Sequence, residues 1–396
     1  MAKRVAIPFK EMQLRVVGPS GEFKASRIQR FEANATLPST DVDELGNNLH
    51  AGTVAGTPEV NSTFQAMDVS AKIFAALTGH DFTSYPASGV STNELGEVDL
   101  IGQVKDDKLV DYVKSMHAKR LRISGFTFTY SVTGEATEEY TAQGTEKRWF
   151  KNDVIVDTFD SGSTSFTLTQ TPIQLKNGNY AMTVIVNGEY VDEVTGAPST
   201  GEYRISTTTL TTGDTRTGSN KVVAIYHANP AGTNWSYISD ATIPAAVRGK
   251  NIPVTIGVND MKRVQSVTIR GQFPTQKIEE MGNENVVGYT AQVPAVTGDI
   301  SVLDTDLEML ALLTTGSISP ADTEFGITEF TPSGISMSIV VHDPVTSGHP
   351  AVKTVYIPQI AVTSEGHSTS VGGNATQTFG FKSVDGNCVI YSGLMP

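Results

Sequence analysis

The chain has 396 residues, and its 39% of hydrophobic residues suffices for the cores of two or three domains. Only 18% of the residues are charged, below the roughly 25% of an average soluble domain, which suggests that an assembly covers much of the surface. The formal net charge of −13 argues against proteins that grip nucleic acid or anionic membranes through Lys and Arg. A single cysteine, Cys388, excludes an intrachain disulfide.

The N-terminal segment, MAKRVAIPFKEMQL, has basic residues but no continuous apolar stretch, so it does not match a secretory signal. The sequence contains no run of about 18 apolar residues, so no transmembrane helix is predicted. We therefore expect a protein that is made in a cytoplasm and has no membrane partner.

Residues 27–79 predict a strand, a polar loop, a second extended segment and a short helix. Apolar and polar residues alternate at the start, as in a strand, at Ile28, Phe31 and Ala33. We expect Asp68 to be the N-cap of the helix and Gly79 to end it, with an apolar stripe made of Ile73, Phe74 and Leu77.

The next segment, 106–120, predicts a second helix. Its sequence, DDKLVDYVKSMHAKR, is acidic at the start and basic at the end, which suits the helix dipole. Residues 121–132 follow with the alternation of a strand.

Residues 154–245 predict a separate β-module. An Asn187-Gly188 pair inside an apolar stretch is a strong hairpin signal. Turn-rich segments separate further short strands, expected at 202–206 and 221–227. Several short strands at this spacing are typical of a small immunoglobulin-like β-sandwich.

The third part of the chain repeats the first. Residues 27–78 match residues 263–314 without a gap, at an offset of 236 (263 − 27), with roughly a quarter of positions identical against about one in sixteen by chance. A second echo, SVTGEAT at 131–137 and SVGGNAT at 370–376, has an offset of 239 (370 − 131). In the second copy we expect Asp304 to cap the helix. Residues 343–354 contain Pro and Gly and predict no counterpart to the helix at 106–120.

These patterns predict a mainly β protein. Two tandem copies of a β-sandwich or barrel domain, each with a short flanking helix, are expected at 1–153 and 246–396. The immunoglobulin-like module at 154–245 lies between them in the sequence. The alternative is a multi-domain β-sandwich protein of the tail-tip or adhesin type, for which Trp149, Trp235 and Tyr237 are the local hints.

An acidic stretch, LPSTDVDELGNN at 37–48, raises the question of a metal or catalytic site. It lacks the ligand positions of an EF-hand, and its echo, FPTQKIEEMGNE, places Lys277 where Asp41 stands in the first copy. We therefore predict no metal, no cofactor and no catalytic residue, and interpret both stretches as loops that contact other subunits. The loop residues are Pro38, Asp41, Asp43, Glu44, Gly46, Asn47, Pro58, Pro274, Glu279, Glu280, Gly282, Asn283 and Pro294.

Two longer stretches carry a resemblance to a known family. They are ELGNNLHAGTVAGTPEVNSTFQAMDVSAKIFAALTG at 44–79 and EMGNENVVGYTAQVPAVTGDISVLDTDLEMLALLTTG at 280–316. Their order of strand, long polar loop, strand and short helix resembles the tail tube proteins of long-tailed bacteriophages. A duplicated chain resembles those members that form homotrimeric, pseudo-hexameric rings.

The resemblance implies a structural virion protein, not an enzyme, whose stacked rings form a tube for DNA from capsid to host. It implies the virion tail as location, with assembly in the host cytoplasm. The implied partners are further copies of the chain, the tape measure, terminator and tip or baseplate proteins, and phage DNA held transiently without specific binding. An acidic wall would let DNA slide, so we expect a net negative channel.

Overall fold

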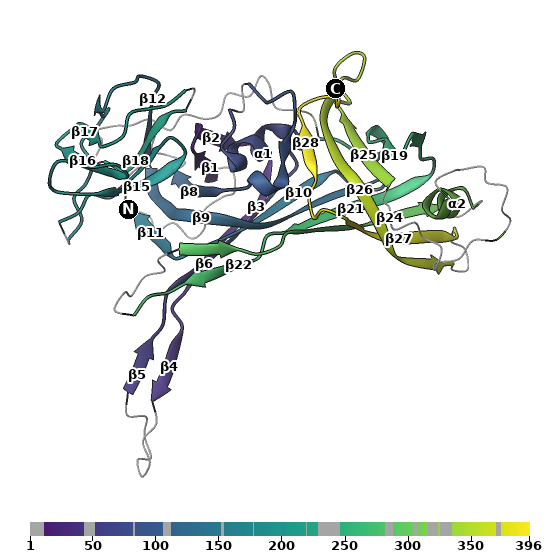
Figure 1. The fold of residues 1–396 in the computed structure, drawn as a ribbon, viewed down its shortest axis with the longest axis horizontal. Helices are drawn as coiled ribbons and strands as arrows, with labels where there is room; N and C mark the ends of the chain where they lie inside the picture. The colour runs from purple at the N-terminus through teal and green to yellow at the C-terminus, as the bar shows by residue number, and fades with distance from the viewer. Residues whose placement is uncertain are drawn as a thin grey trace, which may run out of the picture.

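In a computed structural model, the structure describes residues 12–42, 52–81, 84–105, 112–151, 154–176, 178–218, 220–228, 246–281, 288–303, 307–315, 324, 335–369 and 374–396. Strands dominate these residues, with two short α-helices, α1 and α2, among them (Figure 1). The largest sheet is nearly closed and barrel-like. The expectation of a mainly β protein is confirmed.

The first half of the chain builds seven strands in the order β2-β1-β8-β9-β10-β6-β3, each antiparallel to its neighbour. Their bounds are β1 Met12–Gly18, β2 Gly21–Ala25, β3 Ile28–Thr36, β6 Glu59–Ala66, β8 Glu97–Lys105, β9 Tyr112–Ser131 and β10 Thr137–Gly144. A further strand, β11 (Glu146–Phe150), pairs with the first part of β9. Between β6 and β8 lie α1 (Ala71–Thr78), β7 (Val90–Ser91) and the 3-10 helix η2 (Thr92–Glu94).

Helix α1 covers the core of this half and ends at Gly79, whose φ of 75° is left-handed, as predicted. Its N-cap is Ser70, not the predicted Asp68 two residues earlier. The Asp68 carboxylate accepts hydrogen bonds from the Ser70 amide at 3.0 Å and from the Ser26 hydroxyl at 2.7 Å. Asp68 thus orients the residue that caps the helix. The predicted second cap, Asp304, lies outside the described residues.

The helix predicted over 106–120 is wrong for its described part, because β9 begins at Tyr112. Residues 115–119 are buried on both faces of the sheet. The module covers the face that carries His117, and the core covers the face that carries Met116 and Ala118. A strand buried on both faces does not alternate, so its pattern is easily mistaken for a helix.

The second half builds seven strands in the order β20-β19-β25-β26-β27-β24-β21. Their bounds are β19 Val254–Ile256, β20 Asn259–Asp260, β21 Val264–Gln272, β24 Ala295–Leu303, β25 Ile335–His342, β26 Ala351–Ser368 and β27 Thr376–Ser383. Strand β28 (Val389–Tyr391) pairs with the first part of β26 and with β7. The 3-10 helix η3 (Gly249–Asn251) precedes β19, and α2 (Glu308–Thr315) follows β24.

The two halves form one sheet because β21 pairs antiparallel with β9. The register runs from Ser266 opposite Ser131 to Gln272 opposite Gly125. Figure 1 shows β21 and β9 crossing the middle of the molecule side by side. A single core cluster continues beneath this junction, with Phe126 and Phe128 from one half and Ile269 from the other.

The module carries a second sheet in the order β12-β18-β14-β15-β16-β17-β13. The Asn187-Gly188 hairpin is confirmed, because both residues have positive φ and Val186 pairs with Glu189 across the turn. The bounds are β12 Val154–Phe159, β13 Ser165–Thr167, β14 Met182–Val186, β15 Glu189–Glu193, β16 Glu202–Ser206, β17 Thr209–Thr212 and β18 Val222–His227.

Two hairpins stand apart from both sheets. One joins β4 (Ser39–Val42) to β5 (Gly52–Ala55), and the other joins β22 (Thr275–Ile278) to β23 (Gly288–Ala291). Strands β4 and β5 point away from the body as an arm (Figure 1).

Candidate functional site

The two ends of the large sheet leave strand edges uncovered. Strand β3 pairs with β6 on one side, and in the described ranges no strand lies on its other side. The last part of β26, residues 363–368, pairs with β27, and no strand of the described chain covers its second side either. Open edges are templates for pairing with another chain. These two edges are therefore the first candidate for a functional surface.

The side chains of β3 show that this edge is incompletely covered. Phe31 and Ala33 point toward the core but are only half-buried. At the β9–β21 junction, the corresponding residues Val267 and Ile269 are 2% and 0% exposed. The difference arises because a strand beside β21 covers that edge. A strand beside β3 would have the same effect.

The predicted contact loops are hairpins rather than irregular loops. At the base of the first, the Gly56 amide donates to the Pro38 carbonyl at 2.7 Å, and in the second the Gln292 amide donates to Pro274 at 2.9 Å. Asp41 lies opposite Thr53 and accepts its hydroxyl hydrogen bond at 3.0 Å. The other predicted loop residues lie outside the described ranges: Asp43, Glu44, Gly46, Asn47, Gly282 and Asn283.

The second hairpin contacts the first half of the chain. Lys277 forms an ion pair with Glu59, and the Thr57 hydroxyl donates to Glu279 at 3.1 Å. Pro58 lies between these two contacts in the sequence and is half-buried. Glu280 is exposed, and Pro294 is half-buried beside Gly386. The second hairpin, which carries the repeat of the acidic stretch, thus supplies contacts between the two halves within one chain.

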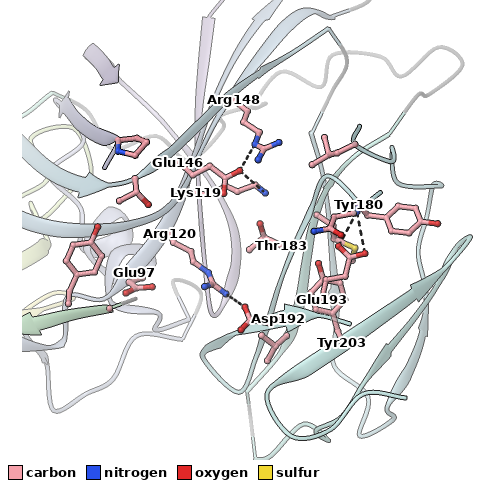
Figure 2. A pocket seen from close by; sticks show the side chains of 18 residues that line it. Glu97, Lys119, Arg120, Glu146, Arg148, Tyr180, Thr183, Asp192, Glu193 and Tyr203 are labelled. Atoms are coloured by element: carbon pink, nitrogen blue, oxygen red, sulfur yellow. Dashed lines mark hydrogen bonds and ion pairs between the residues drawn. The ribbon is translucent and has the colours of Figure 1, made fainter. Parts of the chain in front are cut away.

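A cleft of about 640 Å³ lies where the module, the first half and the second hairpin meet. Figure 2 shows Arg120 of the first half reaching across the cleft to Asp192 of the module, whereas Lys119, Glu146 and Arg148 lie together on one side. Arg120 pairs with Asp192 at 3.3 Å, and Glu146 accepts from Arg148 at 2.5 Å with Lys119 at 3.7 Å. Because these charges neutralise one another, the cleft serves as a polar boundary between the parts.

Two further groups in the cleft are acidic. Glu193 accepts the Tyr180 amide at 3.1 Å, while burial raises the pKa of its carboxyl above the ordinary value. Burial likewise raises the pKa of Glu97, against the opposing charges of Arg120 and Arg122.

A buried cluster joins the module to the first half, and the sequence pattern does not reveal it. His117 contacts Asp99 through Nε2 at 2.7 Å and His227 through Nδ1 at 3.1 Å. Tyr190 donates to the same carboxylate at 2.9 Å. Asp99, His117 and His227 are fully buried, so no substrate can reach them, and the cluster holds the module in place.

The protonation of this cluster follows from its surroundings. Burial alone would raise the pKa of Asp99, but hydrogen bonds from His117, the Arg120 amide and Tyr190 outweigh it, and the pKa lies below its usual value. Burial lowers the pKa of His227 far below that of a free histidine, and electrostatic interactions with neighbouring basic side chains act in the same direction. His227 is therefore neutral at physiological pH.

A second buried cluster joins the two halves. Lys353 on β26 forms an ion pair with Glu138 on β10, and both side chains are 0% exposed. The Tyr140 hydroxyl donates to the same carboxylate at 2.8 Å, and the ammonium lies 4.1 Å from the centre of the Phe128 ring. Burial raises the pKa of Glu138, and Lys353 opposes that shift.

No protein-family model matches the chain, and no curated protein matches it either. Among the described residues, no helix is both long and apolar enough to cross a bilayer, and no three acidic, His or Cys side chains are grouped as metal ligands would be.

Proposed function

We propose that this chain is a structural virion protein that polymerises as stacked rings into a phage tail tube, a conduit for DNA. The observation that carries the proposal is the repetition of one pairing order. The order β2-β1-β8-β9-β10-β6-β3 has a counterpart at every position in β20-β19-β25-β26-β27-β24-β21.

The registers repeat as well. Asp41 opposite Thr53 corresponds, at the 236-residue offset of the sequence repeat, to Lys277 opposite Tyr289. At the other offset, 239, Thr137 opposite Thr129 corresponds to Thr376 opposite Ser368. Both α1 and α2 follow the equivalent strand, β6 or β24. These agreements support two copies of one domain at 1–153 and 246–396.

A duplicated domain favours ring assembly. One copy already pairs with the other inside the chain, through β9 and β21. A contact that joins different surfaces head to tail closes into a ring when its rotation allows. Three chains would then supply six similar domains. The module at 154–245, which we infer to be immunoglobulin-like, adds a separate sheet outside this arrangement.

One face of the joined sheet suits a channel wall. A row of opposing residues crosses seven strands on the face away from the core, and it consists of Arg30, Gln65, Glu139, Thr127, Arg270, Thr297 and Lys382. Over these strands the same face also carries Arg122, Glu32, Glu59 and Asp299, so that cations and anions balance one another there. Threonine and serine fill many of the other positions. Such a wall is polar and has no excess of cations, so it would not hold phosphates.

Negative-stain microscopy of the purified full-length chain tests the proposal. Rings or tubes of uniform diameter are the expected result. Monomers under all concentrations and salt conditions would overturn it, and glycan binding by such monomers would favour the adhesin-type alternative.

A further inference from the structure

We propose that β3 of one chain pairs antiparallel with residues 364–368 of β26 in a second copy, in the register of the internal β9–β21 junction. This inference rests on the proposed function, because it names the surfaces through which the copies would join. The occupant of both open edges is then the same chain.

The internal junction supplies the template. Strand β21 corresponds to β3 at an offset of 236, and the last part of β9 corresponds to β26 at an offset of 239. Thr268 lies opposite Thr129 in the internal junction. Transferring that pair places Glu32 of one chain opposite Ser368 of the next. The internal pair of Arg270 and Thr127 likewise places Asn34 opposite Gly366. The internal pair of Gln272 and Gly125 places Thr36 opposite Ser364.

Each chain offers one β3 edge and one β26 edge, so the contact has a direction. The two surfaces differ, which makes the contact heterologous and allows a ring to close. Pairing would also cover Phe31 and Ala33, as β9 covers their counterparts on β21. The β26 edge is more polar than its counterpart. Glu365 stands at the position of Phe126 in β9, and Gln377 donates to it at 3.0 Å.

A steric feature prevents β3 from taking the place of β21 in the internal junction with β9, and so distinguishes this junction from the proposed external junction between β3 and β26. A Cβ at Gly271 would lie 2.2 Å from the Phe126 ring, so only glycine fits there. The corresponding residue of β3 is Ala35. Strand β3 therefore cannot replace β21 beside β9, whereas Glu365, a flexible side chain, leaves room for Ala35 at the external junction. This mismatch directs β3 to the β26 edge of another chain.

Disulfide trapping tests the register. In the full-length chain, Glu32→Cys with Ser368→Cys places two thiols on directly opposed residues, whose Cα separation in an antiparallel pair lies within disulfide range. The matched control is Ala33→Cys with Ser368→Cys, because a slip of one residue turns the side chain to the other face. Thr129→Cys with Thr268→Cys is the intrachain positive control. Cys388 is buried and stays in every variant.

We expect oxidised Glu32→Cys/Ser368→Cys protein to give interchain oligomers that end in a closed species, at least about tenfold more than the Ala33→Cys/Ser368→Cys control. Equal crosslinking in both variants would overturn the register. Rings seen by microscopy without crosslinks in the first variant would overturn this pairing and leave the proposed function standing. Absence of both rings and crosslinks, with the intrachain control oxidised, would overturn both.

Discussion

The buried pair of Lys353 and Glu138 allows a demanding test of how the two halves are joined. Both side chains are fully buried, and the Tyr140 hydroxyl also donates to the Glu138 carboxylate. Lys353→Met leaves that carboxylate buried without its cation. Removing one partner of a buried pair destabilises a protein by about 3–5 kcal/mol. We expect a loss of this size in the free energy of unfolding of the joined sheet.

The double variant Lys353→Met/Glu138→Met separates this effect from a loss of packing. Replacing both charges with apolar side chains of similar volume is often neutral or stabilising, so the double variant should recover most of the loss. Calorimetry on the wild type, both single variants and the double variant gives the coupling energy. A loss below about 1 kcal/mol for Lys353→Met, as for an exposed pair, would refute the reasoning.

The pH dependence of Lys353→Met has a fixed sign. Burial raises the pKa of Glu138 above its unfolded value even in the wild type, and loss of the cation removes the charge that opposes the shift. A group whose pKa is raised on folding stabilises below its unfolded pKa, and that contribution is lost as pH rises through the folded pKa. The defect of the variant should therefore shrink as pH falls toward about 4.5. A defect that grows with acid would contradict this account.

Three further predictions concern the module and the arm. Folding lowers the pKa of His227, so its neutral form stabilises the folded protein above the unfolded pKa of about 6.5, and this stabilisation is lost as pH falls. The variant His227→Phe should therefore show a weaker dependence of module stability on acid pH, measured by hydrogen exchange. Gly188 has φ of 90°, so Gly188→Ala should lower the stability of the module by about 1 kcal/mol in calorimetry, and an unchanged melting transition would contradict the turn assignment. Reversing the charges at Asp41 and Asp43 to Lys should leave circular dichroism and melting unchanged but disturb rings or tubes in micrographs, and normal tubes would disprove a contact role for the arm.

Local patterns predicted much of the fold because they act over a few residues. The Asn187-Gly188 pair needs two positive φ angles, and the helix at Gly79 needs one, so both were readable from the sequence. Strand β9 was not, because cover on both of its faces removes the alternation that distinguishes a strand.

The two buried clusters could not be predicted from the sequence, for a different reason. His117 and His227 are 110 residues apart, and Lys353 is 215 residues from Glu138. No spacing rule connects such residues; only the pairing of distant strands brings them together. The acidic stretch was interpreted through its echo, and the hairpin contact of Lys277 with Glu59 gives a physical reason for a cation in the second copy.

The pairing of β21 with β9 also bears on how quickly rings form. In a ring of six domains built from three chains, every second junction is made when each chain folds, because both of its strands belong to one molecule. Tethered strands meet at a high effective concentration, so these junctions do not depend on how much protein is present. Only the β3–β26 contacts await collisions between molecules. Ring nucleation should then vary with a lower power of protein concentration than it would for six separate domains.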